Sequence, residues 1–328
     1  MAGERVFVTR RRASAAIDLL KAHFDVEVWE EISPPPRALV VERAAECQAL
    51  MTEIDDVIDA EVLGAGKTLK IVANRAVGLD NVDVREATRR GIAVSNTPGV
   101  LHESCADFTF GLILAAARNI AYGDRQVRAG AWKVFDQSPY LGVDVFGATL
   151  GIIGLGQIGQ ALARRARGFD MRVLYRSRTR NAEAEERLGV SWTPDLPGLL
   201  RESDFVSVHV PLMPETRRLI GQTELGLMKR GAILINASRG GTVDTDALYE
   251  ALASGALGGA ALDVTDPEPI SSDHPLLSLP NVVITPHISS GSVATVRNMA
   301  MIAATNIVEA LTGQPISCCV NPEALRAG

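Results

Sequence analysis

The stretch Thr149-Leu-Gly-Ile-Ile-Gly154-Leu-Gly156-Gln-Ile-Gly159 decides the fold of this 328-residue chain. Its beginning is an apolar run that predicts a buried strand, and apolar side chains recur at helical spacing over residues 157–169. A strand that turns through G-x-G-x-x-G into a helix is typical of a dinucleotide site. Gly154 would allow the tight turn, Gly156 would let the backbone approach a pyrophosphate, and Gly159 would let the helix pack on the strand. The alternative is a tight turn that binds nothing.

The residues after the next expected strand, 171–175, indicate which dinucleotide binds. An acidic residue there, about 20 residues after the glycines, would bind the ribose hydroxyls of NAD. This chain has Arg176-Ser177-Arg178 instead, which would hold a 2′-phosphate by charge-assisted hydrogen bonds. We therefore expect NADP(H) to be preferred over NAD(H), unless both arginines are merely solvent-facing charges. The expected cofactor contacts also include Gln157, Ile158, Pro211, Ala237 and Asp263.

Strand and helix patterns alternate along the chain, which favours parallel sheets. Further strands are expected over residues 5–9, 26–29, 69–73, 92–95, 205–209, 232–235, 259–264 and 282–285. A last helix over 293–311 would cross back to the first domain. We predict the α/β class with two doubly wound, Rossmann-like parallel-sheet domains. Residues 1–100 and 287–328 would form a discontinuous substrate domain, and residues 101–286 would form the NAD(P)-binding domain.

Composition excludes several classes of protein. A net charge of −6 argues against binding to nucleic acid or to anionic membranes. No apolar run approaches the roughly 20 residues that span a bilayer, and the first residues predict a strand rather than a signal peptide. The four cysteines show neither metal-ligand nor disulfide spacing, which indicates a reducing compartment and no metal site. We expect a cytoplasmic protein.

Three polar residues in the C-terminal half suggest chemistry on a keto acid. Arg239, Glu268 and His287 each follow an expected strand, and ligands of open α/β sheets bind at that edge. Arginine can grip a carboxylate with two hydrogen bonds, and an imidazolium can protonate a forming alkoxide. A carboxylate beside the histidine would favour its protonated form and fix its orientation. The alternatives are a salt-bridge arginine, a turn-ending glutamate and a capping histidine.

Two other segments are weaker candidates. Val77 and Gly78 follow an expected strand, and their backbone N–H groups would face an anionic substrate, although a turn glycine explains the pattern equally well. Residues 122–147 show little periodicity. A connection of this length without clear structure suggests an arm, which we place at residues 120–147, that wraps around a partner subunit.

Six motifs together resemble one protein family, the D-isomer-specific 2-hydroxyacid dehydrogenases. They are Val77-Gly-Leu-Asp-Asn81, Asn96-Thr-Pro-Gly-Val100, the glycine motif, Ser238-Arg-Gly240, Leu262-Asp-Val264 and Pro286-His287. Within the family, three stretches are most similar to glyoxylate and hydroxypyruvate reductases: residues 176–178, 264–269 and 274–277. The resemblance covers nearly the whole chain.

The resemblance implies that Arg239, Glu268 and His287 are the catalytic trio and that the substrate lies between the two domains. It also implies a homodimer built by the arm, with Tyr140 or Trp132 reaching the partner's site. The chain departs from the family at Ser289 and Ser290, where glycine is usual directly after the apolar residue, and at residues 101–104. Ser289 is expected to narrow the space near the nicotinamide.

We therefore expect NADP(H)-dependent reduction of glyoxylate or hydroxypyruvate to glycolate or D-glycerate. The substrate would contact Val77, Gly78, Arg239 and His287. Two alternatives stay open. One is a dehydrogenase for another D-2-hydroxy acid, such as 3-phosphoglycerate or D-lactate. The other is a nicotinamide-sensing binding protein similar to a corepressor.

Overall fold

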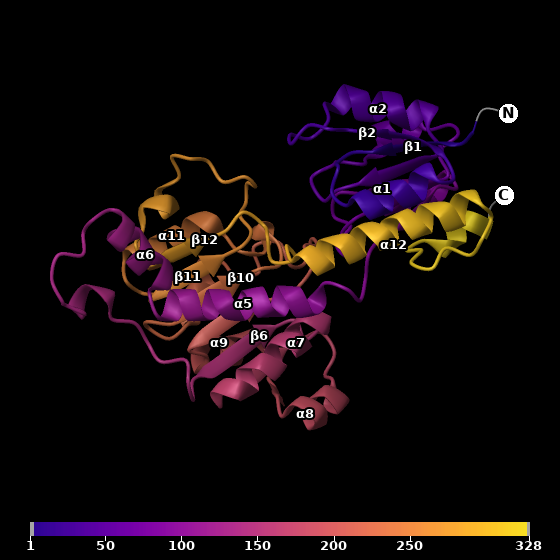
Figure 1. Ribbon diagram of the computed structural model, residues 1–328. Coiled ribbons are helices and arrows are strands. Elements are labelled where there is room, and N and C mark those ends of the chain that lie inside the picture. Colours follow the sequence, from indigo (N-terminus) through magenta and orange to yellow (C-terminus); the bar gives the residue numbers. More distant parts are fainter. Residues whose placement is uncertain (1–2, 327–328) are drawn as a thin grey trace. The chain divides into compact units, whose positions relative to one another are not determined.

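Two compact units make up the protein, whose computed structural model describes residues 3–326 (Figure 1). One unit contains the residues up to Leu101 and those from Gly291 onward, and the other spans His102–Ser290. Each unit has its own parallel sheet with helices packed on both faces. This arrangement confirms the predicted α/β class with two doubly wound sheets. The second boundary between the units falls at 290/291, whereas the sequence places it at 286/287.

The first unit holds a five-stranded sheet in the order β2-β1-β3-β4-β5. Most of these strands are apolar on both faces, as is usual for parallel sheets covered by helices; they are β1 (Arg5–Val8), β2 (Asp25–Val28), β3 (Ala49–Thr52), β4 (Ile71–Asn74) and β5 (Ala93–Ser95). Helices α1 (Ser14–Lys21) and α12 (Val293–Leu311) lie side by side on one face (Figure 1). The other face is covered by α2 (Arg37–Glu46), α3 (Ala60–Ala65) and α4 (Val84–Arg89).

Helix α12 makes the first unit discontinuous in sequence. Ser292 caps the helix by accepting a hydrogen bond from the N–H of Thr295. Its inner face consists mostly of small residues at helical spacing, and these are almost fully buried: Ala300, Ala303, Ala304 and Ile307. Small side chains let the helix lie close to the sheet, and its bounds match the predicted ones.

The second unit holds a seven-stranded sheet in the order β12-β11-β10-β9-β6-β7-β8. Its strands are β6 (Thr149–Ile153), β7 (Arg172–Arg176), β8 (Ser191–Trp192), β9 (Phe205–Val208), β10 (Ile233–Asn236), β11 (Gly259–Leu262) and β12 (Val282–Ile284). One face is covered by α5 (His102–Ala117), α7 (Gln157–Ala166) and α8 (Ala182–Leu188). The other is covered by α9 (Leu196–Glu202), α10 (Gln222–Leu227) and α11 (Thr245–Ala253). No helix between residues 3 and 326 is both long and apolar enough to cross a membrane.

The strand order reverses at β6, and this reversal determines where a ligand can bind. β6 pairs with β7 on one side and with β9 on the other, so that Ile153 lies between Arg176 and Val208. The helices that follow β6 and β9 pack on opposite faces. Open α/β sheets bind ligands in the crevice that such a reversal leaves at the carboxyl ends of the strands.

The arm is more regular than the sequence suggests. Residues 120–128 form helix α6 (Ile120–Arg128), and Ser138–Tyr140 form one 3₁₀ turn. The prediction of an irregular segment from residue 122 onward is therefore wrong for its first part. The sequence pattern does not indicate this helix, because its apolar residues do not pack against the core of its own unit: α6 has no buried residue.

Close packing of β6 on α9 gives a first prediction. A Cβ on Gly151 would lie 2.3 Å from Ser203 Oγ and 2.6 Å from Leu199 Cδ2, and both neighbours are fully buried. We expect Gly151→Ala to lower the free energy of unfolding by about 1–3 kcal/mol, because an overfilled core must shift. Urea denaturation measures this change.

Gly226→Ala in α10 is the matched control, since its Cβ would meet nothing within 4 Å. This substitution should raise the free energy of unfolding by about 0.5–1 kcal/mol, because alanine favours a helix more than glycine does. A Gly151→Ala variant as stable as the wild type would contradict the packing described.

Candidate active site

The glycine turn between β6 and α7 has the geometry that a dinucleotide requires. Gly154 has a φ of 100°, and a Cβ there would lie 2.8 Å from the carbonyl oxygen of His209. A Cβ on Gly159 would lie 2.3 Å from the carbonyl oxygen of Gly154, so α7 can approach β6 only with glycine at this position. Gly156, in contrast, faces open space. No side chain caps the amino end of α7, which leaves N–H groups free for a pyrophosphate.

The end of β7 is tied to this turn by two hydrogen bonds. The N–H of Gly154 donates to the carbonyl of Arg176, and the N–H of Leu155 donates to Ser177 Oγ, both at 2.8 Å. As an acceptor in this bond, the Ser177 hydroxyl still has its own proton to donate to a ligand. Arg178 is exposed and forms no ion pair with any residue in the described part of the chain. The turn therefore offers one hydroxyl and two arginines, Arg176 and Arg178, beside the expected ribose.

His287 and Glu268 form a close pair at the carboxyl edge of the same sheet. The distance between His287 Nδ1 and Glu268 Oε1 is 2.5 Å. An ionised carboxylate can only accept, so Nδ1 carries the hydrogen of this bond. Nε2 bonds to no residue among those described, and it is the ring atom that can exchange a proton with a substrate.

Asp263 holds the turn that carries His287. Its carboxylate accepts hydrogen bonds from Thr285 Oγ1 at 2.7 Å, from the N–H of Ile288 at 2.9 Å and from the N–H of Ser289 at 2.8 Å. Its backbone carbonyl accepts from the N–H of His287 at 2.8 Å. Asp263 is 1% exposed, and His287 has a φ of 54°, a left-handed conformation that is costly for a non-glycine residue. The structure therefore places the Asp263 carboxylate against the histidine turn, and the expected cofactor contact of this residue stays a prediction.

Arg239 follows β10, the strand beside β11. Its backbone carbonyl accepts from Asn236 Nδ2 at 2.9 Å, and its Nη1 donates to the carbonyl of Ser238 at 2.9 Å. The next residue, Gly240, lies so close to Thr265 that a Cβ would come within 1.9 Å of that carbonyl oxygen. The loop with Arg239 is thus packed against the loop that leads to Glu268. Since β10, β11 and β12 are neighbours, the three predicted catalytic residues follow adjacent strands.

Gln157 and Ile158 lie in the first turn of α7, and four other predicted residues lie in two places. Ala237 is buried directly after β10, and Pro211 is exposed after β9. Val77 and Gly78 belong to the first unit, where asparagine side chains hold their carbonyl groups. The backbone N–H groups of Val77 and Gly78 donate to no residue among those described.

Ser289, which is expected to narrow the space near the nicotinamide, is buried against helix α5, and the expectation stays a prediction. Ser289 is 5% exposed, its carbonyl accepts from Ser104 Oγ at 3.3 Å, and its side chain lies against Cys105. Ser104 and Cys105 both belong to α5. The sequence could not show this, because the direction of Ser289 is set by the hydrogen bond between its N–H and Asp263.

A second histidine, His209, lies beside the glycine turn and is unsuited to donate a proton. His209 follows β9, and its Nε2 lies 2.8 Å from Ser207 Oγ. Burial lowers the pKa of His209 to about 4, so its ring is neutral near pH 7. Of these two histidines, only His287 has a carboxylate partner among the described residues. No group of His, Cys, Asp and Glu within residues 3–326 is arranged to hold a metal ion.

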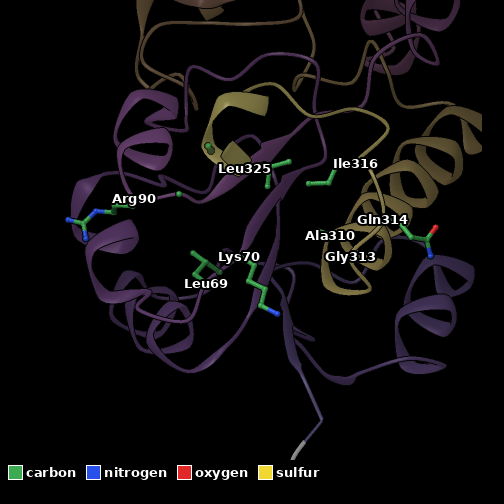
Figure 2. A pocket seen from close by; sticks show the side chains of 10 residues that line it. Leu69, Lys70, Arg90, Ala310, Gly313, Gln314, Ile316 and Leu325 are labelled. Atoms are coloured by element: carbon green, nitrogen blue, oxygen red, sulfur yellow. The ribbon is translucent and has the colours of Figure 1, made fainter. Parts of the chain in front are cut away.

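A surface cavity of about 560 Å³ lies elsewhere, in the first unit (Figure 2). Its two cationic side chains already have partners: Lys70 Nζ lies 2.5 Å from Glu4 Oε1, and Arg90 Nε donates to Glu86 Oε1 at 2.7 Å. The carboxyl end of α12, with its partial negative charge, also borders the cavity. This cavity therefore suits an anionic substrate poorly, and no predicted site residue lines it.

Comparison with known proteins places the chain in a family. The family model described as "D-isomer specific 2-hydroxyacid dehydrogenase, NAD binding domain" matches residues 110–289. The glyoxylate reductase of Korarchaeum cryptofilum is 50% identical over 323 residues, which cover 98% of this chain and 97% of that protein. The glyoxylate reductase of Pyrococcus horikoshii is 47% identical over 326 residues, with coverage of 98% and 97%.

Solved structures agree with this placement. The TT0316 protein of Thermus thermophilus superposes with a TM-score of 0.91 at 46% identity, covering 96% of this chain and 99% of that one. An NADPH-dependent glyoxylate/hydroxypyruvate reductase of Sinorhizobium meliloti, in complex with NADP and malonate, superposes with a TM-score of 0.85 at 33% identity, covering 98% and 97%. The chain belongs to the D-isomer-specific 2-hydroxyacid dehydrogenases and is an NAD(P)-dependent oxidoreductase, which confirms the resemblance seen in its motifs.

Proposed function

We propose that this protein reduces glyoxylate and hydroxypyruvate to glycolate and D-glycerate, with NADPH as the preferred cofactor. The observation that carries the proposal is the 2.5 Å distance between His287 Nδ1 and Glu268 Oε1. Glu268 lies on the loop that packs against the loop of Arg239. The names of the relatives support glyoxylate as substrate. Residues 102–290 would bind the cofactor, and the remainder of the chain would form the substrate domain.

Each proposed role follows from the chemistry of the side chain. Arg239 would hold the substrate carboxylate through its planar guanidinium group, and the N–H groups of Val77 and Gly78 are further proposed contacts. When bound, the nicotinamide supplies a hydride to C2 of the keto acid. His287 would donate the Nε2 proton to the carbonyl oxygen, so that hydride and proton together complete the alcohol. Glu268 would keep the ring oriented and stabilise its charged form before the transfer.

The role of His287 is tested by His287→Asn. Asparagine tolerates the left-handed backbone of this position but cannot protonate the substrate. We expect kcat for glyoxylate to fall by about 10²- to 10⁴-fold, the usual contribution of a general acid, while cofactor binding measured by fluorescence stays unchanged. His23→Asn, on an exposed helix end of the first unit, is the control and should keep full activity. Near-normal turnover of His287→Asn would refute the mechanism.

The cofactor preference is tested by initial rates. Glyoxylate and hydroxypyruvate are each reduced with NADPH and with NADH. We expect kcat/KM to be about 10- to 100-fold higher with NADPH, because a 2′-phosphate would gain charged hydrogen bonds. Arg178→Ala should lose most of this preference by raising KM for NADPH alone. Equal or better use of NADH by the wild type would show that the ribose pocket is misassigned.

A homodimer is the proposed assembly, and the arm supports it. Eight large apolar residues of the arm are exposed: Ile120, Val127, Trp132, Val134, Phe135, Leu141, Val143 and Phe146. Phe135 is the most exposed of the eight, at 87%. Exposed large apolar side chains concentrated in one segment are typical of a protein–protein interface.

Light scattering after gel filtration tests the assembly. The wild type should have twice the 35.0 kDa mass of one chain, and the double variant Phe135→Asp/Phe146→Asp should be monomeric, because two charges would be buried at the interface. Ile32→Asp is the matched control, since Ile32 is 98% exposed in the first unit; its mass should not change. A monomeric wild type at micromolar concentration would contradict the proposal.

A further inference from the structure

Two arginine side chains meet on one indole ring at the outer edge of the seven-stranded sheet. The guanidinium carbon of Arg176 lies 5.9 Å from the ring centroid of Trp192, and that of Arg180 lies 5.8 Å from the same centroid. Both distances are within the range of cation–π attraction. Trp192 belongs to the two-residue strand β8, where it pairs in register with Tyr175, the residue before Arg176. The strand pairing therefore places the ring beside the expected 2′-phosphate pocket.

Hydrogen bonding does not explain the presence of an indole at this position. The Trp192 Nε1 atom is buried and has no hydrogen-bond partner among the described residues. A buried N–H without a partner is costly, and a phenylalanine or leucine would fill an apolar space without that cost. What the indole adds is its large aromatic face, and the two guanidinium groups use that face.

The partners of the two arginines differ in charge. Arg180 also donates to Glu185 through Nε at 2.9 Å and Nη2 at 2.7 Å. Glu185 is fixed in turn by the Tyr175 hydroxyl at 2.7 Å, so this carboxylate neutralises Arg180. Arg176 has no carboxylate partner in the described part of the chain; it contacts the Ser177 carbonyl and the Trp192 ring. Its positive charge is therefore held in place without being neutralised.

We propose that Trp192 is a positioning residue for cofactor choice. It holds the Arg176 guanidinium beside Ser177, so that the cation is ordered before the 2′-phosphate binds. A carboxylate could order the arginine equally well, but it would cancel the charge and repel the phosphate. The neutral ring leaves the charge in place and does not repel the phosphate. Because the arginine is already ordered, it loses less side-chain entropy when the phosphate binds. The inference rests on the proposed NADPH preference.

Calorimetry on the full-length protein tests the inference without turnover. The probes are adenosine 2′,5′-bisphosphate and adenosine 5′-monophosphate, which differ only in the 2′-phosphate. In Trp192→Leu, we expect Kd for the bisphosphate to rise by about 2- to 10-fold, the range of one or two cation–π contacts, and Kd for the monophosphate to stay the same. Trp192→Phe, which keeps an aromatic face, should restore most of the affinity. Trp29→Leu in the first unit is the matched control and should bind both probes as the wild type does.

A double-mutant cycle separates positioning from structural damage. If Trp192 acts through Arg176, adding Trp192→Leu to Arg176→Met should cause little further loss of bisphosphate affinity. Should Trp192→Leu lack a cooperative melting transition, Trp192→Met fills the same space with a flexible non-aromatic side chain and takes its place. Equal weakening of both probes, or an unchanged preference in Trp192→Leu, would overturn the inference alone. A wild type that binds both probes equally would instead overturn the 2′-phosphate pocket itself.

Discussion

The three hydrogen bonds to the buried carboxylate of Asp263 are the interaction on which the candidate active site depends. A carboxylate at 1% exposure would be strongly destabilising without donors, and here the Thr285 hydroxyl and two backbone N–H groups supply them. These bonds fold residues 285–289 into one turn. The left-handed backbone of His287 costs free energy. The hydrogen bonds to Asp263 on both sides of His287 hold the backbone in this conformation.

The pairing of neighbouring strands also fixes the positions of the loops relative to one another. The N–H of Asp263 donates to the carbonyl of Asn236 at 2.8 Å, and Asn236 holds the loop of Arg239 through its side chain. Gly240 then fits against the carbonyl of Thr265, where no other residue has room. The positions of Arg239, Glu268 and His287 thus follow from the pairing of β10, β11 and β12. Loops attached in this way lose little further freedom when a ligand binds.

The sequence predicts best where one local pattern determines one structure. Strand β6 and helix α12 have their predicted bounds because a continuous apolar run and a long helical stripe each point to one element. Strand β3, with the sequence Ala-Leu-Met-Thr, is not predicted, because it has no β-branched or aromatic apolar residue to distinguish it from a helix. Strand β8 is too short to show any period. The candidate trio could be named from residue type and position after strands, whereas the partners of Asp263 and Trp192 could not, since they depend on register between strands distant in sequence.

Three residues of the second unit, His287, Asp263 and Arg176, each have a partner that fixes the side chain and suits its proposed role. His287 has a carboxylate neighbour, which accepts the hydrogen bond from Nδ1 and so orients the ring. Asp263 is the opposite case: its negative charge is buried and is bound by three neutral hydrogen-bond donors, which fix the histidine turn. Arg176 rests on a neutral ring, which leaves its positive charge available to a phosphate. Exchanging the partners would undo both proposed roles, because a carboxylate beside Arg176 would repel the phosphate and an aromatic ring beside His287 would not accept the hydrogen bond from Nδ1. For these residues, the proposed role therefore depends on the partner as well as on the charged residue itself.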